Sequence, residues 1–266
     1  MTAEPTTETV RYEVRERIAV VTLDRPAVKN ALGPDEWQRL DELAARAEAD
    51  ADVRVMLVRG AGGVFSAGGD LRTMPERLAL EPHVRRARLL ADAQVVRRFR
   101  AMGKPIVAEI AGAAVGAGLS LALACDVRMA ATTAKLGATF HKIGLTGDFG
   151  MLWLLPRAVG PTRALDLLYS AELVDGARAE AIGLVSRAVL PERLEVEAWA
   201  YAQRLAAGPP VALAFTKRGV ALSLERELAE LMAWEADAQA ACSRTADARE
   251  GVAAFLEKRP PVFRGR

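Results

Sequence analysis

The chain has 266 residues, of which 51% are hydrophobic, and a formal net charge of +2. It is long enough to bury a substantial core, and this balance excludes intrinsic disorder and argues against a nucleic-acid partner. Its two cysteines, Cys125 and Cys242, give neither a disulfide framework nor a metal-ligand spacing.

The first half of the chain begins with strands and a helix. Residues 1–10, MTAEPTTETV, lack the basic region and apolar core of a signal peptide, so we expect a cytoplasmic protein. Two strands are predicted at 12–14 and 18–23. An amphipathic helix is predicted at 35–50, and a third strand at 53–59.

A glycine-rich segment, GAGGVFSAGGDL, follows that strand at residues 60–71. Five glycines in twelve residues indicate positive φ angles or a close approach of the backbone to a ligand. Tight turns alone explain the segment equally well. The next helix, predicted at 83–102, carries many arginines. We interpret them as a solvated face, with phosphate binding as the alternative.

The central stretch, residues 104–126, predicts a buried strand, a turn with three glycines and a helix. Such a turn leaves backbone N–H groups unpaired at the positive end of the helix dipole. These groups suit an anion, or an oxygen that becomes anionic during a reaction. An oxyanion hole needs two such groups, and each of the two glycine-rich turns can supply one.

Three other interpretations apply to the central stretch. A transmembrane helix is disfavoured by Glu109 within the apolar run and Pro105 at its start. A dinucleotide fingerprint lacks its third glycine, and Asp126 follows too soon to bind a ribose. A buried strand and helix in close backbone contact remains compatible with these residues.

A third glycine-rich segment, residues 140–160, contains Asp148 before an apolar helix that is predicted from about Met151 to near Pro156. An acid at this place is either a helix cap or a buried carboxylate with a raised pKa, suited to proton transfer. The local sequence favours the cap.

The remainder of the chain is predicted to be increasingly helical. A helix begins at Pro161, a short helix covers 177–182, and a last strand covers 184–190. Beyond it, every segment has helical periodicity. We therefore predict a core at 1–191 that holds the site, and an α-helical region at 192–266 for capping and trimerisation.

Several of these segments together resemble the crotonase, or enoyl-CoA hydratase/isomerase, superfamily. The matching motifs are DRPAVKNAL, VFSAGGDL, AGAAVGAGLSLALACD, IGLTGDFGMLWLLPRAVG and EGVAAFLEKRPPVF. The resemblance implies an α/β, ClpP-like spiral of ββα turns with an α-helical C-terminal region. It also implies a homotrimer or hexamer and an acyl-CoA thioester substrate. No metal, no membrane partner and no cofactor beyond the CoA moiety are expected.

The same resemblance suggests the site residues. It places the thioester oxygen between the amides of Ala67 and Ala117. The candidates for binding CoA are Ala27, Val28, Lys29, Ala67, Gly69, Asp70, Leu71 and Gly116. Lys258 is expected to reach a CoA phosphate, including one on a neighbouring subunit.

The departures from the family pattern bear on the reaction. The positions of the two glutamates that hydratases use hold Ser120 and Phe140. Asp148 matches the aspartate of a subgroup that resembles ring-epoxide phenylacetyl-CoA isomerase and enoyl-CoA isomerases. The resemblance therefore favours an isomerase with Asp148 as its base. A hydratase in which Asp148 activates water and a non-catalytic acyl-CoA binder are the alternatives.

Other polar residues near these motifs receive structural interpretations. We expect His141 to be a surface or packing residue. The Ser120 hydroxyl is expected to bond to the backbone of its own helix, and Glu109 to be a paired structural acid. Five apolar residues are candidates to line an acyl pocket: Met74, Leu78, Phe140, Phe149 and Trp153.

Overall fold

The computed structural model describes residues 8–266, so the expectation for the first seven residues lies outside it. The main sheet has six strands, of which β1 and β2 form an antiparallel hairpin and the others are parallel. In sheet order they are β1 (Val10–Arg15), β2 (Ile18–Leu23), β3 (Val55–Gly60), β4 (Ile106–Ile110), β6 (Val127–Ala131) and β9 (Arg187–Val189).

A second, three-stranded sheet lies beside the glycine-rich turns. It consists of β5 (Ala113–Val115), β7 (Lys135–Gly137) and β8 (Val174–Asp175). β5 and β7 are parallel, whereas β7 and β8 are antiparallel. An isolated bridge between Ser66 and Ala114 joins the first glycine-rich turn to this sheet.

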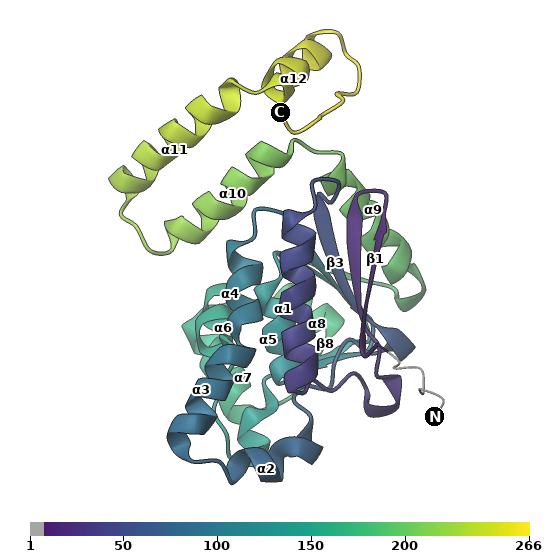
Figure 1. Cartoon of the computed structure of the whole chain (residues 1–266), viewed down its shortest axis with the longest axis vertical. Helices are drawn as coiled ribbons and strands as arrows, with labels where there is room; N and C mark the ends of the chain where they lie inside the picture. The colour runs from purple at the N-terminus through teal and green to yellow at the C-terminus, as the bar shows by residue number, and fades with distance from the viewer. Residues whose placement is uncertain (1–7) are drawn as a thin grey trace, which may run out of the picture.

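Helices pack around the main sheet (Figure 1). Those of the core are α1 (Pro34–Ala49), α2 (Met74–Leu78), α3 (Pro82–Asp92), α4 (Gln94–Ala101), α5 (Ala117–Ala124), α6 (Met151–Val159), α7 (Pro161–Ser170) and α8 (Gly176–Ala181). Short 3-10 turns also occur, including one at Pro26–Val28 and one at Thr139–Ile143. The α/β class of the predicted fold is confirmed.

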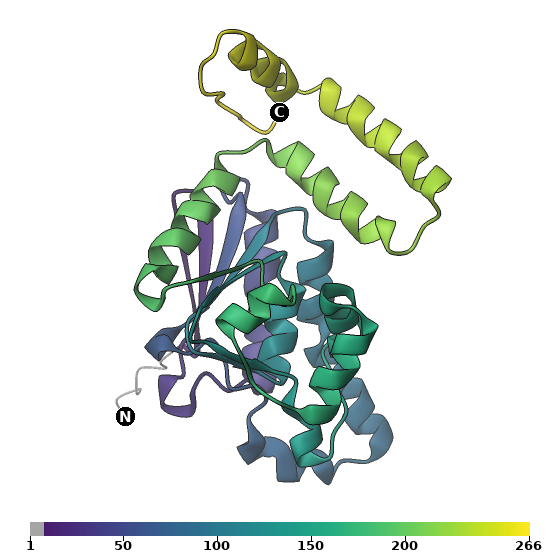
Figure 2. The same ribbon diagram turned by 180° about the vertical axis from the view of Figure 1, so that it is seen from behind.

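The C-terminal region is helical, as predicted. It contains α9 (Leu194–Ala206), α10 (Pro210–Ser223), α11 (Leu228–Ser243) and α12 (Ala246–Leu256). α9 packs on β2, β3, β4 and β6, whereas α10, α11 and α12 extend away from the sheet (Figures 1 and 2). The boundary at 191 stays a prediction. Within residues 8–266, none of the helices combines the length and apolar character needed to cross a membrane.

Two helix predictions require correction. The helix predicted at 83–102 is two helices, because the chain leaves regular helical geometry at Ala93, where ψ is −3°. The helix expected to end near Pro156 continues as α6 to Val159. It ends at Gly160, whose amide donates a hydrogen bond to the carbonyl of Pro156 and whose φ of 81° favours glycine.

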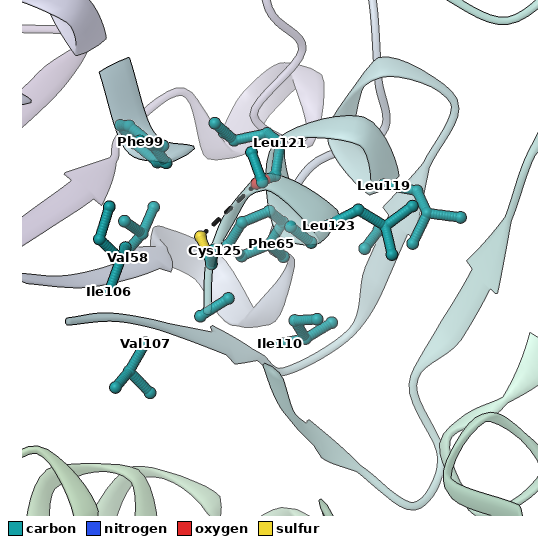
Figure 3. Packing of buried hydrophobic residues seen from close by; sticks show 14 of the residues in the cluster. Val58, Phe65, Phe99, Ile106, Val107, Ile110, Leu119, Leu121, Leu123 and Cys125 are labelled. Atoms are coloured by element: carbon teal, nitrogen blue, oxygen red, sulfur yellow. Dashed lines mark hydrogen bonds between the residues drawn. The ribbon is translucent and has the colours of Figure 1, made fainter. Parts of the chain in front are cut away.

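The helix that follows the second glycine-rich turn, α5, is buried along its whole length. Figure 3 shows its leucines among apolar side chains of the main sheet and α4, including Phe99 and Ile106. The Cys125 thiol donates a hydrogen bond to the carbonyl of Leu121, and burial raises its pKa to about 12. The thiol therefore stays protonated and serves packing. This packing fixes the direction of α5 and hence of its first amides.

Candidate active site

One cavity brings the three glycine-rich segments together. Its volume is about 370 Å³, and it is bordered by the first glycine-rich turn, the start of α5, the 139–149 loop and residues of α2 and α3. Residues from these segments that border it include Ala67, Gly69, Gly116, Ala117 and Asp148. A larger hollow of about 550 Å³ lies between α10 and the core, but none of the predicted site residues lines it.

The two turns that begin this site are in direct backbone contact. The Ser66 amide donates to the carbonyl of Ala113, and the Val115 amide donates to the carbonyl of Ser66. A Cβ atom at Gly118 would lie 2.8 Å from the Cβ of Ser66, which is closer than real Cβ atoms approach. Only glycine at position 118 permits this approach, so the pairing of the turns depends on it.

The amides of the first turn differ in their availability. The Ala67 N–H donates to the carbonyl of Lys29 at 2.9 Å, and the Gly68 N–H donates to Oγ of Ser66 at 3.1 Å. Among residues 8–266, no acceptor is recorded for the N–H of Gly69 or of Ala117. The role predicted for the Ala67 amide is therefore contradicted, because its only proton is already donated within the fold.

Asp148 borders the cavity with an unsatisfied carboxyl oxygen. Its Oδ1 is buried and has no hydrogen-bond partner among the described residues. Burial raises the pKa of this carboxyl to about 6, against the opposing positive charges of Arg77 and Arg85. α6 begins after Gly150, and no side chain caps it. The cap interpretation of Asp148 is therefore wrong, and the carboxyl remains available for proton transfer.

Ser120 holds the backbone of Asp148 in place. This serine is fully buried in α5, and its hydroxyl lies 3.0 Å from the carbonyl of Asp148 and 3.5 Å from the carbonyl of Gly116. The expected bond to its own helix backbone is present as the longer contact, and the shorter one links α5 to the loop of Asp148. The local sequence around a buried serine does not indicate which loop its hydroxyl will contact.

Asn30 is a further structural residue that the motif left unexplained. Its side-chain amide donates to the carbonyls of Ala61 and Val64, at 2.9 and 2.6 Å, and its oxygen accepts from the Arg25 amide. These bonds tie the 3-10 turn at Pro26–Val28 to the glycine-rich segment. An asparagine next to the apolar pair Ala31 and Leu32 was the available signal for such a buried anchor.

The residues predicted to bind CoA fall into three groups. Ala67, Gly69, Leu71 and Gly116 border the cavity. The segment Ala27, Val28 and Lys29 does not line the cavity but adjoins it through the Lys29–Ala67 hydrogen bond.

Asp70 and Lys258 form the third group, since neither reaches the cavity. The Asp70 side chain is buried and binds Arg25 at 3.2 Å and Arg72 at 2.5 Å. These bonds hold the pKa of its carboxyl far below the usual range. Lys258 follows α12, at the opposite end of the molecule from α2 and α3 (Figures 1 and 2). A contact between Lys258 and a neighbouring subunit's CoA stays a prediction.

Three of the five residues predicted to line an acyl pocket border the cavity. Met74, Phe140 and Phe149 line the cavity. Leu78 and Trp153 do not, and both are exposed. The side chain of Phe140 occupies the place where the family pattern of a hydratase has an acid.

Two further polar residues lie outside the cavity. His141 is exposed, with its ring centroid 6.1 Å from that of Tyr169, which agrees with the surface interpretation. Glu109 was expected in a pair, but within residues 8–266 no ion pair or hydrogen bond is recorded for it. Burial raises the pKa of Glu109, and the charge of Arg59 on the neighbouring strand opposes the shift.

The arginine-rich helix is not only a solvated face. Arg85 from α3 lines the cavity, together with Arg77 of α2 and Lys142. Arg77 donates to the Asp92 carboxylate at 3.1 Å, whereas no hydrogen bond or ion pair is recorded for the guanidinium of Arg85 among the described residues. Elsewhere on the helix pair, Arg98 binds Asp41.

The chain is similar to many proteins along its whole length. The model of the enoyl-CoA hydratase/isomerase family matches residues 13–266. A Rhodobacter capsulatus protein named "Probable enoyl-CoA hydratase" is 40% identical over 97% of this chain and 98% of its own. A crotonyl-CoA hydratase of Syntrophomonas wolfei is 35% identical over 96% of this chain and 98% of its own.

Solved structures agree with this similarity. An enoyl-CoA hydratase/isomerase from Cupriavidus metallidurans CH34 has a TM-score of 0.91 and 32% identity, covering 97% of both chains. An enoyl-CoA hydratase from Polaromonas sp. JS666 has a TM-score of 0.92 and 32% identity, covering 96% of this chain and 99% of its own. The chain is therefore an acyl-CoA-processing enzyme, and it belongs to the enoyl-CoA hydratase/isomerase family.

Proposed function

We propose that this enzyme is an enoyl-CoA isomerase that moves a proton between two carbons of the acyl group. The observation that carries the proposal is that Asp148 is the one carboxyl group among the residues that line the described cavity. A 1,3-proton shift needs one base, because substrate and product differ only in the position of one proton. The proposal requires no cofactor beyond the CoA of the substrate.

The reaction is written for a 3-enoyl-CoA ester. The ionised Asp148 takes a proton from C2, and the electrons of the broken C–H bond form a thioester dienolate. Asp148 then returns the same proton to C4, which leaves the double bond between C2 and C3. A pKa of about 6 suits both steps, since the group is mostly ionised at neutral pH and its acid form is still accessible.

The dienolate oxygen is assigned to the amides of Gly69 and Ala117. Both border the cavity, and both keep an unused N–H among the described residues. A Cβ built on Gly68 lies 3.5 Å from the Ala117 nitrogen, so the two turns converge there. Losing one such donor typically costs about 2.7–4 kcal/mol of transition-state stabilisation.

Hydration is the second candidate, because both relatives described above are named hydratases. This chain lacks the two acids that a two-acid hydration needs, because the two positions hold Ser120 and Phe140. Phe140 is apolar, and the Ser120 hydroxyl contacts the Asp148 carbonyl. A hydratase would therefore have to activate water with Asp148 alone. The raised pKa of Asp148 is compatible with that role as well.

The test compares the wild type with Asp148→Asn on 3-enoyl-CoA and 2-enoyl-CoA esters, with products identified by mass spectrometry in H2O and D2O. Isomerisation of the 3-enoyl ester should fall at least about 100-fold in the variant. Glu109→Gln is the matched control, because it removes another buried carboxyl whose pKa is raised but which lies outside the cavity.

The outcomes separate the candidates. Water addition to the 2-enoyl ester without isomerisation of the 3-enoyl ester would establish a hydratase instead. Isomerisation that survives in Asp148→Asn would overturn the assignment of the base. Tight binding of the esters without turnover by the wild type would favour a non-catalytic acyl-CoA binder.

A further inference from the structure

The cavity contains a guanidinium that the proposed reaction does not use. Arg85 lines the cavity together with apolar residues that include Leu89, Met74 and Phe149. Its side chain has no recorded hydrogen bond or ion pair within residues 8–266. A partly buried cation loses hydration, and this loss is offset when an anion binds it.

Among the residues that line the cavity, positively charged side chains outnumber negatively charged ones. Arg77 and Lys142 line the same cavity, and Asp148 is its one lining acid. Arg77 is paired with Asp92 at 3.1 Å, which both neutralises and fixes it. Of the two arginines that line the cavity, Arg85 is thus the one that remains available to bind an incoming anion.

Arg85 and the proposed base, Asp148, line the same cavity. The positive charges of Arg77 and Arg85 also oppose the raised pKa of the Asp148 carboxyl. In the proposed reaction the base faces the acyl carbons. The segment expected to hold CoA, Ala27–Lys29, does not line the cavity and contacts it through the hydrogen bond from the Ala67 amide to the Lys29 carbonyl.

We propose that Arg85 makes this enzyme selective for acyl-CoA esters whose acyl group carries a second carboxylate, at the end distant from the thioester. The carboxylate accepts hydrogen bonds from the Arg85 guanidinium, which has no acidic partner of its own among the described residues. This assignment deepens the proposed function and rests on the same cavity. The lining residues favour an acyl carboxylate over a CoA phosphate, because Arg85 shares the cavity with the base, whereas the segment Ala27–Lys29 does not line it.

The first test measures binding alone, so that it does not depend on isomerase activity. Isothermal titration calorimetry compares adipyl-CoA, hexanoyl-CoA and free CoA on the wild type, Arg85→Gln and Arg85→Lys. The two esters differ only in a terminal carboxylate or methyl group. Arg86→Gln is the matched control, since Arg86 is an exposed neighbour on α3 that does not line the cavity.

We expect the wild type to bind adipyl-CoA more tightly than hexanoyl-CoA. Arg85→Gln should weaken adipyl-CoA binding about 10- to 100-fold, with hexanoyl-CoA and free CoA changing less than about threefold. Arg85→Lys should retain part of the preference, and Arg86→Gln should retain all of it. An equal loss for both esters and for free CoA would show a phosphate contact and overturn the proposal, as would a wild type that prefers hexanoyl-CoA.

The second test uses the reacting pair 3-hexenedioyl-CoA and 3-hexenoyl-CoA. Arg85→Gln should raise KM for the diacid ester more than for the neutral ester, because only the diacid ester loses a contact. Both are measured at pH 8.5, where Asp148 stays ionised even though the lost charge of Arg85 raises its pKa further, so kcat for the neutral ester should change less than about threefold. Failure of the wild type to isomerise either ester, with the adipyl-CoA preference intact, would refute the isomerase while leaving the selectivity established. Isomerisation of both esters with equal kcat/KM would refute the selectivity alone.

Discussion

The carboxyl group of Asp148 is the single residue on which the activity should depend most directly. Only its ionised form can take a proton from C2, and its pKa is about 6. We therefore expect kcat/KM for the 3-enoyl ester to rise about tenfold per pH unit below 6 and to level off above it. A pH–rate profile from pH 4.5 to 8.5 measures this. A flat profile with a substrate that dissociates quickly would contradict the assignment.

The same burial makes a prediction about stability. The folded-state pKa of Asp148 is raised above the unfolded value of 3.8, so the wild type loses stability as the pH rises from about 4 to 6. Asp148→Asn has no such loss. Its free energy of unfolding, relative to wild type, should increase over this range by up to about 3 kcal/mol and stay constant above it. Urea unfolding at several pH values checks this, and a pH-independent difference would show that the carboxyl is not buried.

Ser120 illustrates a residue that acts through another. Its hydroxyl holds the Asp148 carbonyl at 3.0 Å, so Ser120→Ala should release the loop that positions the base. We expect kcat to fall about tenfold, while KM and the apparent pKa of about 6 stay close to wild type. Loss of one hydrogen bond should cost about 1 kcal/mol of stability. A fall in kcat that merely tracks the unfolded fraction would mean that the hydroxyl is only structural.

Among the elements, the contact of the two glycine-rich turns sets the spacing of the proposed oxyanion donors. A methyl group at position 118 would collide with both the Cβ and the carbonyl of Ser66, each at 2.8 Å. Gly118→Ala should therefore push α5 from the first turn and lower kcat/KM at least about tenfold. Gly103→Ala is the control, because its new Cβ meets only Ala214, at 3.6 Å. Equal activity of the two variants would show that the spacing is not critical.

The sequence predicted elements better than it predicted contacts between them. The strand at Ile18–Leu23 and the three outer C-terminal helices follow from apolar periodicity, which is a local property. No glycine or proline in the sequence marks the break between α3 and α4 at Ala93. The sequence also could not show that the free amide belongs to Gly69 and not to Ala67. The Ala67 amide donates to the Lys29 carbonyl, which comes from a distant segment.

At the scale of the whole molecule, the C-terminal helices leave apolar side chains uncovered. α10, α11 and α12 extend away from the sheet (Figure 2). α10 and α11 each have only one buried residue. Phe255 on α12 is 83% exposed, and Leu228 and Met232 on α11 are also exposed. Exposed apolar surface of this extent typically marks a protein contact. Within the region predicted for trimerisation, α10, α11 and α12 thus have little internal cover.

We therefore expect the protein to form a homotrimer or hexamer through this region. Light scattering after size-exclusion chromatography should give about three or six times the chain mass of 28.5 kDa. Phe255→Glu should shift the mass toward the monomer, because a carboxylate at a closed apolar contact is costly to desolvate. Leu190→Glu, which changes an exposed apolar residue of the core outside these helices, is the control and should leave the mass unchanged. A wild type that stays monomeric at micromolar concentration would refute the assembly and, with it, the contact predicted for Lys258 across subunits.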